Sequence, residues 1–405
     1  MDITGTSSGQ ATLASPQLGH IRRWAERLVD SGKLAGLTTM IAHRGKTAYL
    51  HSCGQADREA GLAMTPETIV RIYSMTKPLT SVAIMMLYEQ GLFQLDDPVS
   101  RYLPCFAAMR VASGGQRGKI DTVPAARLIT IRDLLTHTSG LTYGFMQSTL
   151  VDALYRDEGI DFQTATCTLG ELVERAAALP LLSQPGAEWN YSIATDVLGH
   201  LVAVIAGESF DDFLLHRIIA PLGMVDTAFH VPEAKHARFA ANYWRTDTDG
   251  LQLIDDPKTS RFLTHPAICS GGGGLVSTAG DYMRFCQFML NRGALDGVRL
   301  LSRKSIELMT SNHLRGDMAA MGMPRFSESS YEGIGFGLGF SVMLDPARAQ
   351  ILGSPGEYAW GGAASTAFWI DPAEELAVVM LTQLMPSSAY PIRRELRVLT
   401  SAALE

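Results

Sequence analysis

The sequence predicts an α/β (α+β) fold, in which an antiparallel sheet made from both chain termini is flanked by helices and joined to a mainly helical lobe. Two pairs of strand-like runs lie near opposite ends of the chain, and the segments between them have helical spacing. With 405 residues, the chain is longer than a single hydrophobic core usually supports. We therefore expect two domains, an α/β domain from residues 1–95 and 225–405 and a mainly helical domain from residues 96–224.

The N-terminal part of the sheet follows a helix. Apolar side chains in residues 20–29 recur at helical spacing, which predicts a helix there. Residues 37–42 and 47–51 have strand-like patterns and are joined through Arg44 and Gly45. This arrangement predicts a β-hairpin.

The C-terminal part of the sheet has a similar signature. Residues 366–370 and 376–382 predict a second strand pair, with Asp371-Pro372 as the turn between them. Residues 336–343 alternate with glycines, which predicts one further strand that another backbone or a ligand approaches closely.

The middle of the chain is predicted to be mainly helical. Its helical segments are punctuated by prolines, glycines and aspartates. The predicted helices span residues 80–89, 131–135, 195–205 and 210–219.

Composition and charge limit the kinds of partner. The chain is 46% hydrophobic and 19% charged, with a formal net charge of -7 and no basic block. Nucleic acid and anionic membrane surfaces are therefore not expected as partners. No apolar run approaches the roughly 20 residues that span a bilayer, and residues 1–16 lack the features of a secretory signal.

The cysteines and histidines predict neither a disulfide framework nor a metal site. Five cysteines are scattered along the chain without a Cys-x-x-Cys pair, and no histidine has a common ligand spacing. We therefore expect reduced thiols, a cytoplasmic location, no metal and no cofactor. Cys269, which precedes a glycine run, is interpreted as a buried structural thiol. Whether the protein is a monomer or a homo-oligomer stays open.

Ser74 and Lys77 form the first candidate catalytic pair. Of the seven lysines, Lys77 alone has a serine three residues before it. Residues three apart share a helix face, so the Lys77 amine can reach the Ser74 hydroxyl and activate it as a nucleophile. Pro78 fits the first turn of a helix that begins near Ser74, and the N-terminus of that helix favours a developing oxyanion. The alternative is that Ser74 only caps the helix while Lys77 extends to solvent.

Tyr191 is the second candidate. It lies in the segment Glu188-Trp189-Asn190-Tyr191-Ser192, between a Pro-Gly turn and a predicted helix. A tyrosine in such a loop can direct its hydroxyl into a cleft as a donor or acceptor. The alternative is a packed aromatic residue with its hydroxyl hydrogen-bonded.

The third candidate segment is Trp360-Gly361-Gly362-Ala363, which leads into a predicted strand. Two glycines before a strand let a substrate approach the backbone, where an N–H group can serve as an oxyanion donor. The alternative is an ordinary glycine turn.

Together, these three clusters resemble the family VIII carboxylesterases, which are serine esterases built like class C β-lactamases and penicillin-binding proteins. The resemblance covers nearly the whole chain and includes several flanking segments. These segments are Leu95-Asp96-Asp97-Pro98, residues 134–141, Pro221-Leu222-Gly223-Met224 and residues 272–278. The fold implied is the β-lactamase-like serine hydrolase fold.

The resemblance also implies roles for the candidate residues. Ser74 would be the nucleophile, Lys77 would hold or accept its proton, and Tyr191 would act as the general base in acylation. The N–H groups of Ser74 and Ala363 would form the oxyanion hole.

Two departures from the β-lactamase pattern favour an uncharged ester as the small-molecule substrate. β-Lactamases of this fold usually carry Tyr-x-Asn and Lys-Thr-Gly, whereas this chain has Tyr191-Ser192-Ile193 and Trp360-Gly361-Gly362. We therefore expect Ile193, Trp360, Gly361 and Gly362 to contact the substrate. The bulky Trp360 favours short acyl chains.

The expected activity is that of a carboxylesterase, with at most weak hydrolysis of cephalosporins. An acyltransferase on the same scaffold, which passes the acyl group to an alcohol or amine, and a β-lactamase or peptidase stay open as alternatives. A non-catalytic binding protein is disfavoured, because such a protein does not need Ser74, Lys77 and Tyr191 together.

Two other features resemble catalytic motifs. Gly5-Thr6-Ser7-Ser8-Gly9 has the lettering of a nucleophile elbow but lies in a polar tail without the strand and helix that an elbow needs. His137 suggests a Ser-His-Asp triad, but we interpret it as structural.

Overall fold

The computed structural model describes residues 13, 15–248, 250–322 and 328–404. The Gly-x-Ser-x-Gly pattern at residues 5–9 lies outside them. Among the described residues, the largest sheet has eight strands in the order β12-β13-β14-β15-β16-β1-β2-β3, with antiparallel neighbours throughout. Its strands are β1 (Gly36–His43), β2 (Lys46–Asp57), β3 (Leu62–Ala63), β12 (Ile334–Phe336), β13 (Ser341–Met343), β14 (Tyr358–Gly361), β15 (Ala367–Asp371) and β16 (Leu376–Leu381).

The two ends of the chain meet in the middle of this sheet. Strand β1 pairs with β16, with Thr38 opposite Leu381 and His43 opposite Leu376. Every residue of β16 is buried, and its side chains alternate between two hydrophobic cores. This pattern shows that helices cover both faces of the sheet. The predicted sheet from both termini is confirmed.

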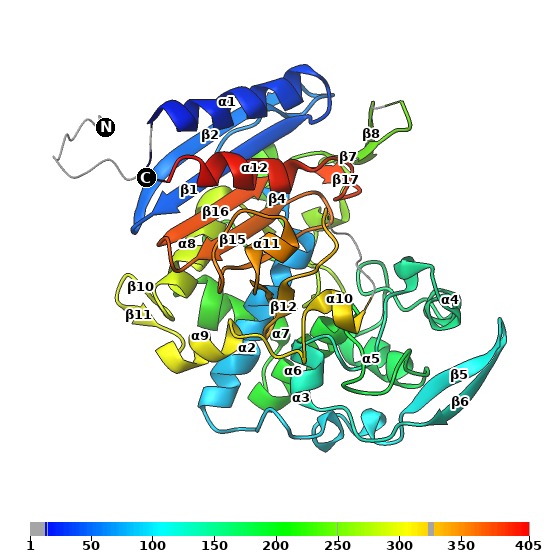
Figure 1. Cartoon of the computed structure of the whole chain (residues 1–405). Helices are drawn as coiled ribbons and strands as arrows, with labels where there is room; N and C mark the ends of the chain where they lie inside the picture. The colour runs from blue at the N-terminus through cyan, green and yellow to red at the C-terminus, as the bar shows by residue number, and fades with distance from the viewer. Residues whose placement is uncertain (1–12, 14, 249, 323–327, 405) are drawn as a thin grey trace.

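Helices α1 (Ser15–Asp30) and α12 (Ile392–Ser401) pack together over one face, and α8 (Ala279–Leu290) covers the other (Figure 1). The helix predicted at residues 20–29 is the greater part of α1. The larger core lies on the α8 side and continues into the helical region, because it includes Leu134, Leu198 and Val379. The proposed boundaries at residues 95 and 225 stay a prediction.

The middle of the chain folds around α2 (Thr76–Glu89), which packs against α6 (Ala194–Ala206). The other helices there are α3 (Ile131–Leu135), α4 (Leu150–Asp157), α5 (Leu169–Ala177) and α7 (Phe210–Leu214), and a π-helical turn at Leu215–Ile219 follows α7. Helices α3, α4 and α5 each begin with a threonine capping box, which satisfies N–H groups at the helix start.

Shorter elements complete the fold. The small strands are β4 (Val70–Arg71), β7 (Asn242–Arg245), β8 (Leu251–Asp255), β9 (Val276–Ser277), β10 (Ala294–Leu295), β11 (Val298–Arg299) and β17 (Leu384–Met385). The remaining helices are α9 (Arg303–Met309), α10 (Met318–Met321) and α11 (Pro346–Ala349). None of the helices in the described residues is long and apolar enough to cross a bilayer.

Two features differ from the sequence predictions. Residues 336–343 do not form one strand: β12 and β13 are separate antiparallel strands, and Gly339 between them has a left-handed φ of 96° and packs against the Ser81 side chain. The mainly helical segment also contains a hairpin, β5 (Arg110–Gln116) and β6 (Lys119–Pro124), which extends away from the helices (Figure 1). Most of its residues are exposed and polar, so it has no apolar alternation that could predict it.

Candidate active site

Ser74 lies in a short 3-10 turn, Tyr73–Met75, that leads directly into α2. This position confirms the predicted start of the helix. Tyr73 has a left-handed φ of 42°, which is rare for a residue with a side chain. The Tyr73 ring is buried edge-on against Phe262, and its hydroxyl accepts a hydrogen bond from Asn242. The surrounding structure therefore holds a strained backbone conformation immediately before Ser74.

Lys77 is buried, with 2% of its surface exposed, and its amine has three hydrogen-bond partners. Nζ donates to Ser74 Oγ at 3.3 Å, to the Tyr143 hydroxyl at 3.0 Å and to the Gly272 carbonyl at 2.6 Å. The alternative in which Lys77 extends to solvent is therefore wrong.

Tyr191 contacts Ser74 from the loop that precedes α6. Its hydroxyl donates to Ser74 Oγ at 2.6 Å, and Lys77 Nζ lies 4.5 Å from its ring centroid. The ring is packed against His137, with centroids 5.1 Å apart, and against Trp360, with centroids 5.5 Å apart. The structure therefore brings Ser74, Lys77 and Tyr191 together at one point.

The third segment lies against the backbone that precedes the nucleophile. Trp360 and Gly361 end β14, and Gly362 lies so close to the Ile72 carbonyl and the Thr366 hydroxyl that a side chain there would collide with both. Ala363 and Ser74 line the same cavity. The glycine at position 362 therefore accommodates the protein's own backbone. Gly361 and Gly362 also line the cavity, and their predicted contact with the substrate stays a prediction.

The cavity above Ser74 has a volume of about 890 Å³. Its lining includes five aromatic residues, Tyr143, Phe145, Trp189, Trp244 and Trp360. A cavity of this size and aromatic character suits a mainly apolar organic molecule.

Ile193 does not have its predicted role. It is fully buried in the main hydrophobic core, at the residue that precedes α6, and it is not part of the cavity wall. The helix directs Asp196 toward the cavity instead. The predicted contact between Ile193 and the substrate is therefore wrong.

Asp196 is a site residue that the sequence analysis missed. It is buried, and its carboxylate accepts hydrogen bonds from Ser270 Oγ at 2.5 Å and from the Gly272 N–H at 2.9 Å. Burial raises the pKa of Asp196, and the positive charge of Lys77 opposes this effect. Asp196 thus binds the N–H group of Gly272, whereas Lys77 binds its carbonyl. Asp196 therefore fixes the position of the carbonyl that holds the lysine.

Tyr143 supplies a neutral hydroxyl to the same network. Burial raises its pKa well above the ordinary value, and the nearby Asp196, Tyr191 and Asp161 add to the effect. It therefore keeps its proton and accepts the hydrogen bond from Lys77.

His137 lies beneath the Tyr191 ring and bonds to a different serine. Its Nδ1 is 3.2 Å from Ser192 Oγ. Burial, followed by the charge of Lys77, lowers its pKa well below the usual range, so the imidazole is neutral. This position gives His137 a packing role next to Tyr191.

Comparisons with known proteins agree with this geometry. The family model described as "Beta-lactamase" matches residues 21–402. "Esterase EstB" of Burkholderia gladioli is 32% identical over 94% of this chain and 93% of its own length. "Monacolin J acid methylbutanoyltransferase" of Aspergillus terreus is 31% identical over 82% of this chain and 80% of its own length.

A solved structure gives the same result. "EstCE1, a hydrolase with promiscuous acyltransferase activity" superposes with a TM-score of 0.79 and 28% identity, and covers 96% of this chain and 99% of its own. These matches confirm the predicted fold and the resemblance to family VIII esterases. The chain therefore belongs to the beta-lactamase family, within its group of serine hydrolases and acyltransferases.

Proposed function

We propose that this protein is a carboxylesterase that hydrolyses small, short-acyl-chain esters through an acyl-enzyme on Ser74. One observation carries the proposal. Ser74 Oγ lies between the Tyr191 hydroxyl at 2.6 Å and Lys77 Nζ at 3.3 Å, on the wall of an aromatic cavity of about 890 Å³. A nucleophile with two proton-handling groups in hydrogen-bond reach is the arrangement that acyl transfer needs.

In the reactive state, the Tyr191 hydroxyl has first released its own proton to solvent, so that its oxygen can act as the base. In acylation, Ser74 Oγ attacks the ester carbonyl carbon while the Ser74 proton passes to this Tyr191 oxygen. The tetrahedral oxyanion is stabilised by the N–H groups of Ser74 and Ala363, and each such donor is worth about 10²–10³ in kcat. Tyr191 then gives the proton to the departing alkoxide, which leaves as the alcohol. The ammonium of Lys77 offsets the negative charge that develops beside it.

Deacylation repeats these steps with water. Tyr191 takes a proton from the attacking water, and the oxyanion again lies between Ser74 and Ala363. Collapse of the intermediate breaks the bond to Ser74 Oγ and returns the proton to it. The carboxylic acid leaves and the enzyme is restored.

The third motif supports an uncharged substrate. Trp360 packs 5.5 Å from the Tyr191 ring, where it narrows the space beside Ser74. Arg393 is one of the arginines that line the cavity, and its Nη2 donates to the carbonyls of Gly362 at 2.9 Å and Thr366 at 3.0 Å. These bonds hold its guanidinium against the protein's own backbone, which favours an ester over a β-lactam carboxylate. The names of EstB and EstCE1 point to the same activity.

The test measures release of p-nitrophenol from p-nitrophenyl butyrate, with nitrocefin as the β-lactam. Ser74→Ala is expected to remove ester turnover. The control, Ser81→Ala, removes a hydroxyl from the same helix on the side of Gly339 and is expected to keep it. Undiminished turnover in Ser74→Ala contradicts the mechanism, and fast Ser74-dependent nitrocefin cleavage assigns a β-lactamase instead.

Acyl transfer is the second candidate. The methylbutanoyltransferase relative and the described promiscuity of EstCE1 favour it, as does a cavity large enough to hold an acceptor beside the acyl-enzyme. Adding a bulky alcohol to the ester assay and measuring the new ester by mass spectrometry separates the two activities. Transfer that exceeds hydrolysis at low alcohol concentration assigns a transferase.

A further inference from the structure

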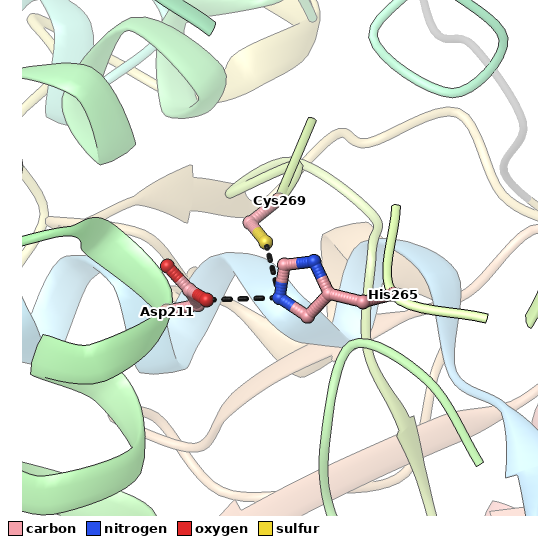
Figure 2. Close-up of side chains that lie close together, drawn as sticks. All are labelled: Asp211, His265 and Cys269. Atoms are coloured by element: carbon pink, nitrogen blue, oxygen red, sulfur yellow. Dashed lines mark hydrogen bonds and ion pairs between the residues drawn. The ribbon is translucent and has the colours of Figure 1, made fainter. Parts of the chain in front are cut away.

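Three side chains with metal-binding atoms converge outside the catalytic cavity. Asp211 comes from α7, whereas His265 and Cys269 come from the loop between the 3-10 helix Arg261–Leu263 and β9. One carboxylate oxygen, one imidazole nitrogen and the sulfur lie within 4.8 Å of one another. Figure 2 shows Asp211 and Cys269 both directed at the same ring edge of His265.

The geometry differs from that of a Cys-His-Asp catalytic triad. In a triad, the histidine uses one ring nitrogen for the nucleophile and the other for the carboxylate. Here the same atom, His265 Nε2, lies 2.9 Å from Asp211 Oδ2 and 3.8 Å from Cys269 Sγ. One nitrogen cannot relay a proton between these two groups. The carboxylate oxygen and the sulfur instead approach the same nitrogen.

We propose that Asp211, His265 and Cys269 bind a divalent metal ion of the zinc class. Zinc takes thiolate, imidazole and carboxylate ligands with bonds of about 2.0–2.3 Å, which places neighbouring ligand atoms about 3.3–3.6 Å apart in a tetrahedron. The observed separations of 2.9 and 3.8 Å bracket this range. A sulfur ligand disfavours magnesium and calcium. The fourth position is left for water.

Charge and proton balance are consistent with such an ion. On binding, the S–H bond breaks, the sulfur–metal bond forms and one proton is released to solvent. The thiolate and the Asp211 carboxylate then balance the two positive charges of the ion.

The backbone next to Cys269 is held in place by hydrogen bonds, and His265 is accessible. The residues after Cys269 are anchored, because Ser270 Oγ donates to Asp196 at 2.5 Å and the Gly271 carbonyl accepts from Thr80 Oγ1 at 2.8 Å. The His265 side chain is 54% exposed, which gives an ion a route from solvent. A preformed and accessible set of ligands is what binding requires.

The histidine spacing in the sequence predicted no metal. The structure shows the cluster because folding brings Asp211 next to His265, although Asp211 lies 54 residues earlier in the chain. A ligand from a distant helix gives no motif that sequence reading detects.

Cobalt(II) alone, added to the reduced full-length protein, tests the proposal. We expect one equivalent to bind and to give a near-ultraviolet sulfur-to-cobalt charge-transfer band. Cys269→Ser should lose the band, and His265→Asn should weaken binding by at least about tenfold. The control is Cys105→Ser, which removes an exposed thiol and should keep the band.

Circular dichroism and ester turnover of each variant show that it is folded. The absence of a charge-transfer band in the folded wild-type protein would overturn the proposal. A band that persists in folded Cys269→Ser would do the same, because another thiol would then be the ligand.

Discussion

At the scale of single residues, the neutral imidazole of His137 is important for how Tyr191 is held. Its ring lies 5.1 Å from that of Tyr191 and 5.6 Å from that of Phe336. Because burial and Lys77 lower its pKa well below the ordinary value, the packed ring adds no second positive charge beside the lysine. Protonation of His137 therefore requires the site to open.

This burial predicts a pH-dependent loss of stability. Below the ordinary histidine pKa of about 6.5, the unfolded chain binds a proton at His137 that the folded chain does not. The free energy of unfolding should therefore fall as the pH falls below that value, by about 1.4 kcal/mol per pH unit for each such proton. Asparagine tolerates the φ of 55° at this position. His137→Asn should reduce the slope of the free energy of unfolding against pH, measured by urea unfolding, by the equivalent of about one proton.

The matched control is His20→Asn, because His20 is exposed on α1. Its slope should equal that of the wild-type protein. Some slope remains in His137→Asn, since burial also lowers the pKa values of His51, His200, His230 and His313. Equal slopes in His137→Asn and the wild-type protein would show that His137 is protonated in the folded state.

Single residues were predictable where a motif carries its own spacing. Ser74 and Lys77 lie three apart on one turn, so local geometry alone brings them together. Asp196 was not predictable, because its partners Ser270 and Gly272 are 74 and 76 residues away. Ile193 was misplaced because the first turn of a helix determines which side chain faces the cavity, and a sequence does not display that rotation.

At the scale of elements, the contact between the end of β14 and the segment before Ser74 determines the geometry of the proposed oxyanion hole. Gly362 donates to the Thr366 carbonyl at 2.9 Å, and its Cα faces the Ile72 carbonyl with no room for a side chain. The backbone N–H groups of Ala363 and Ser74 thus depend on one close approach between a strand end and a turn.

Gly362→Ala should therefore separate these two elements. The added methyl group collides with backbone at Ile72, so Ala363 must move away from Ser74. We expect kcat for p-nitrophenyl butyrate to fall by about 10²-fold, with a smaller change in KM. Steady-state kinetics on folded protein measure this.

Gly280→Ala is the control for an added methyl group. Nothing lies within 4 Å of the position of its new Cβ on α8, so kcat should be unchanged. If Gly362→Ala also keeps its kcat, the Ala363 N–H does not stabilise the oxyanion.

Elements were predictable where the hydrophobic pattern is strong. The pairs β1–β2 and β15–β16 have apolar residues on buried faces and recognisable turns, and both were found. The break between β12 and β13 was missed because it depends on Gly339 packing against Ser81 of α2, a tertiary contact.

At the scale of the whole molecule, the last helix of the chain ties the sheet to the site. From α12, Arg393 binds the carbonyls of Gly362 and Thr366, and Arg397 forms an ion pair with Glu357 next to β14. The Glu357 side chain is buried, with 4% exposed, and that of Arg397 is partly buried, with 12% exposed. Arg397 also lies over the Trp369 ring, 4.6 Å from its centroid.

Removing the Glu357 charge should destabilise the fold. Burial raises the pKa of Glu357 and the Arg397 guanidinium opposes that shift, so the carboxylate depends on its partner. In Glu357→Gln, Arg397 keeps a buried charge without a counterion, which should lower the free energy of unfolding by about 3 kcal/mol. The additional change Arg397→Met should recover part of that loss, because no unpaired charge then remains.

The exposed pair Lys304–Glu307 is the control, and Glu307→Gln should leave stability unchanged. Urea unfolding of the wild-type protein, of Glu357→Gln, of the double variant and of Glu307→Gln measures these changes in stability. Equal effects of Glu357→Gln and Glu307→Gln would show that the contact between α12 and the sheet rests on apolar packing alone.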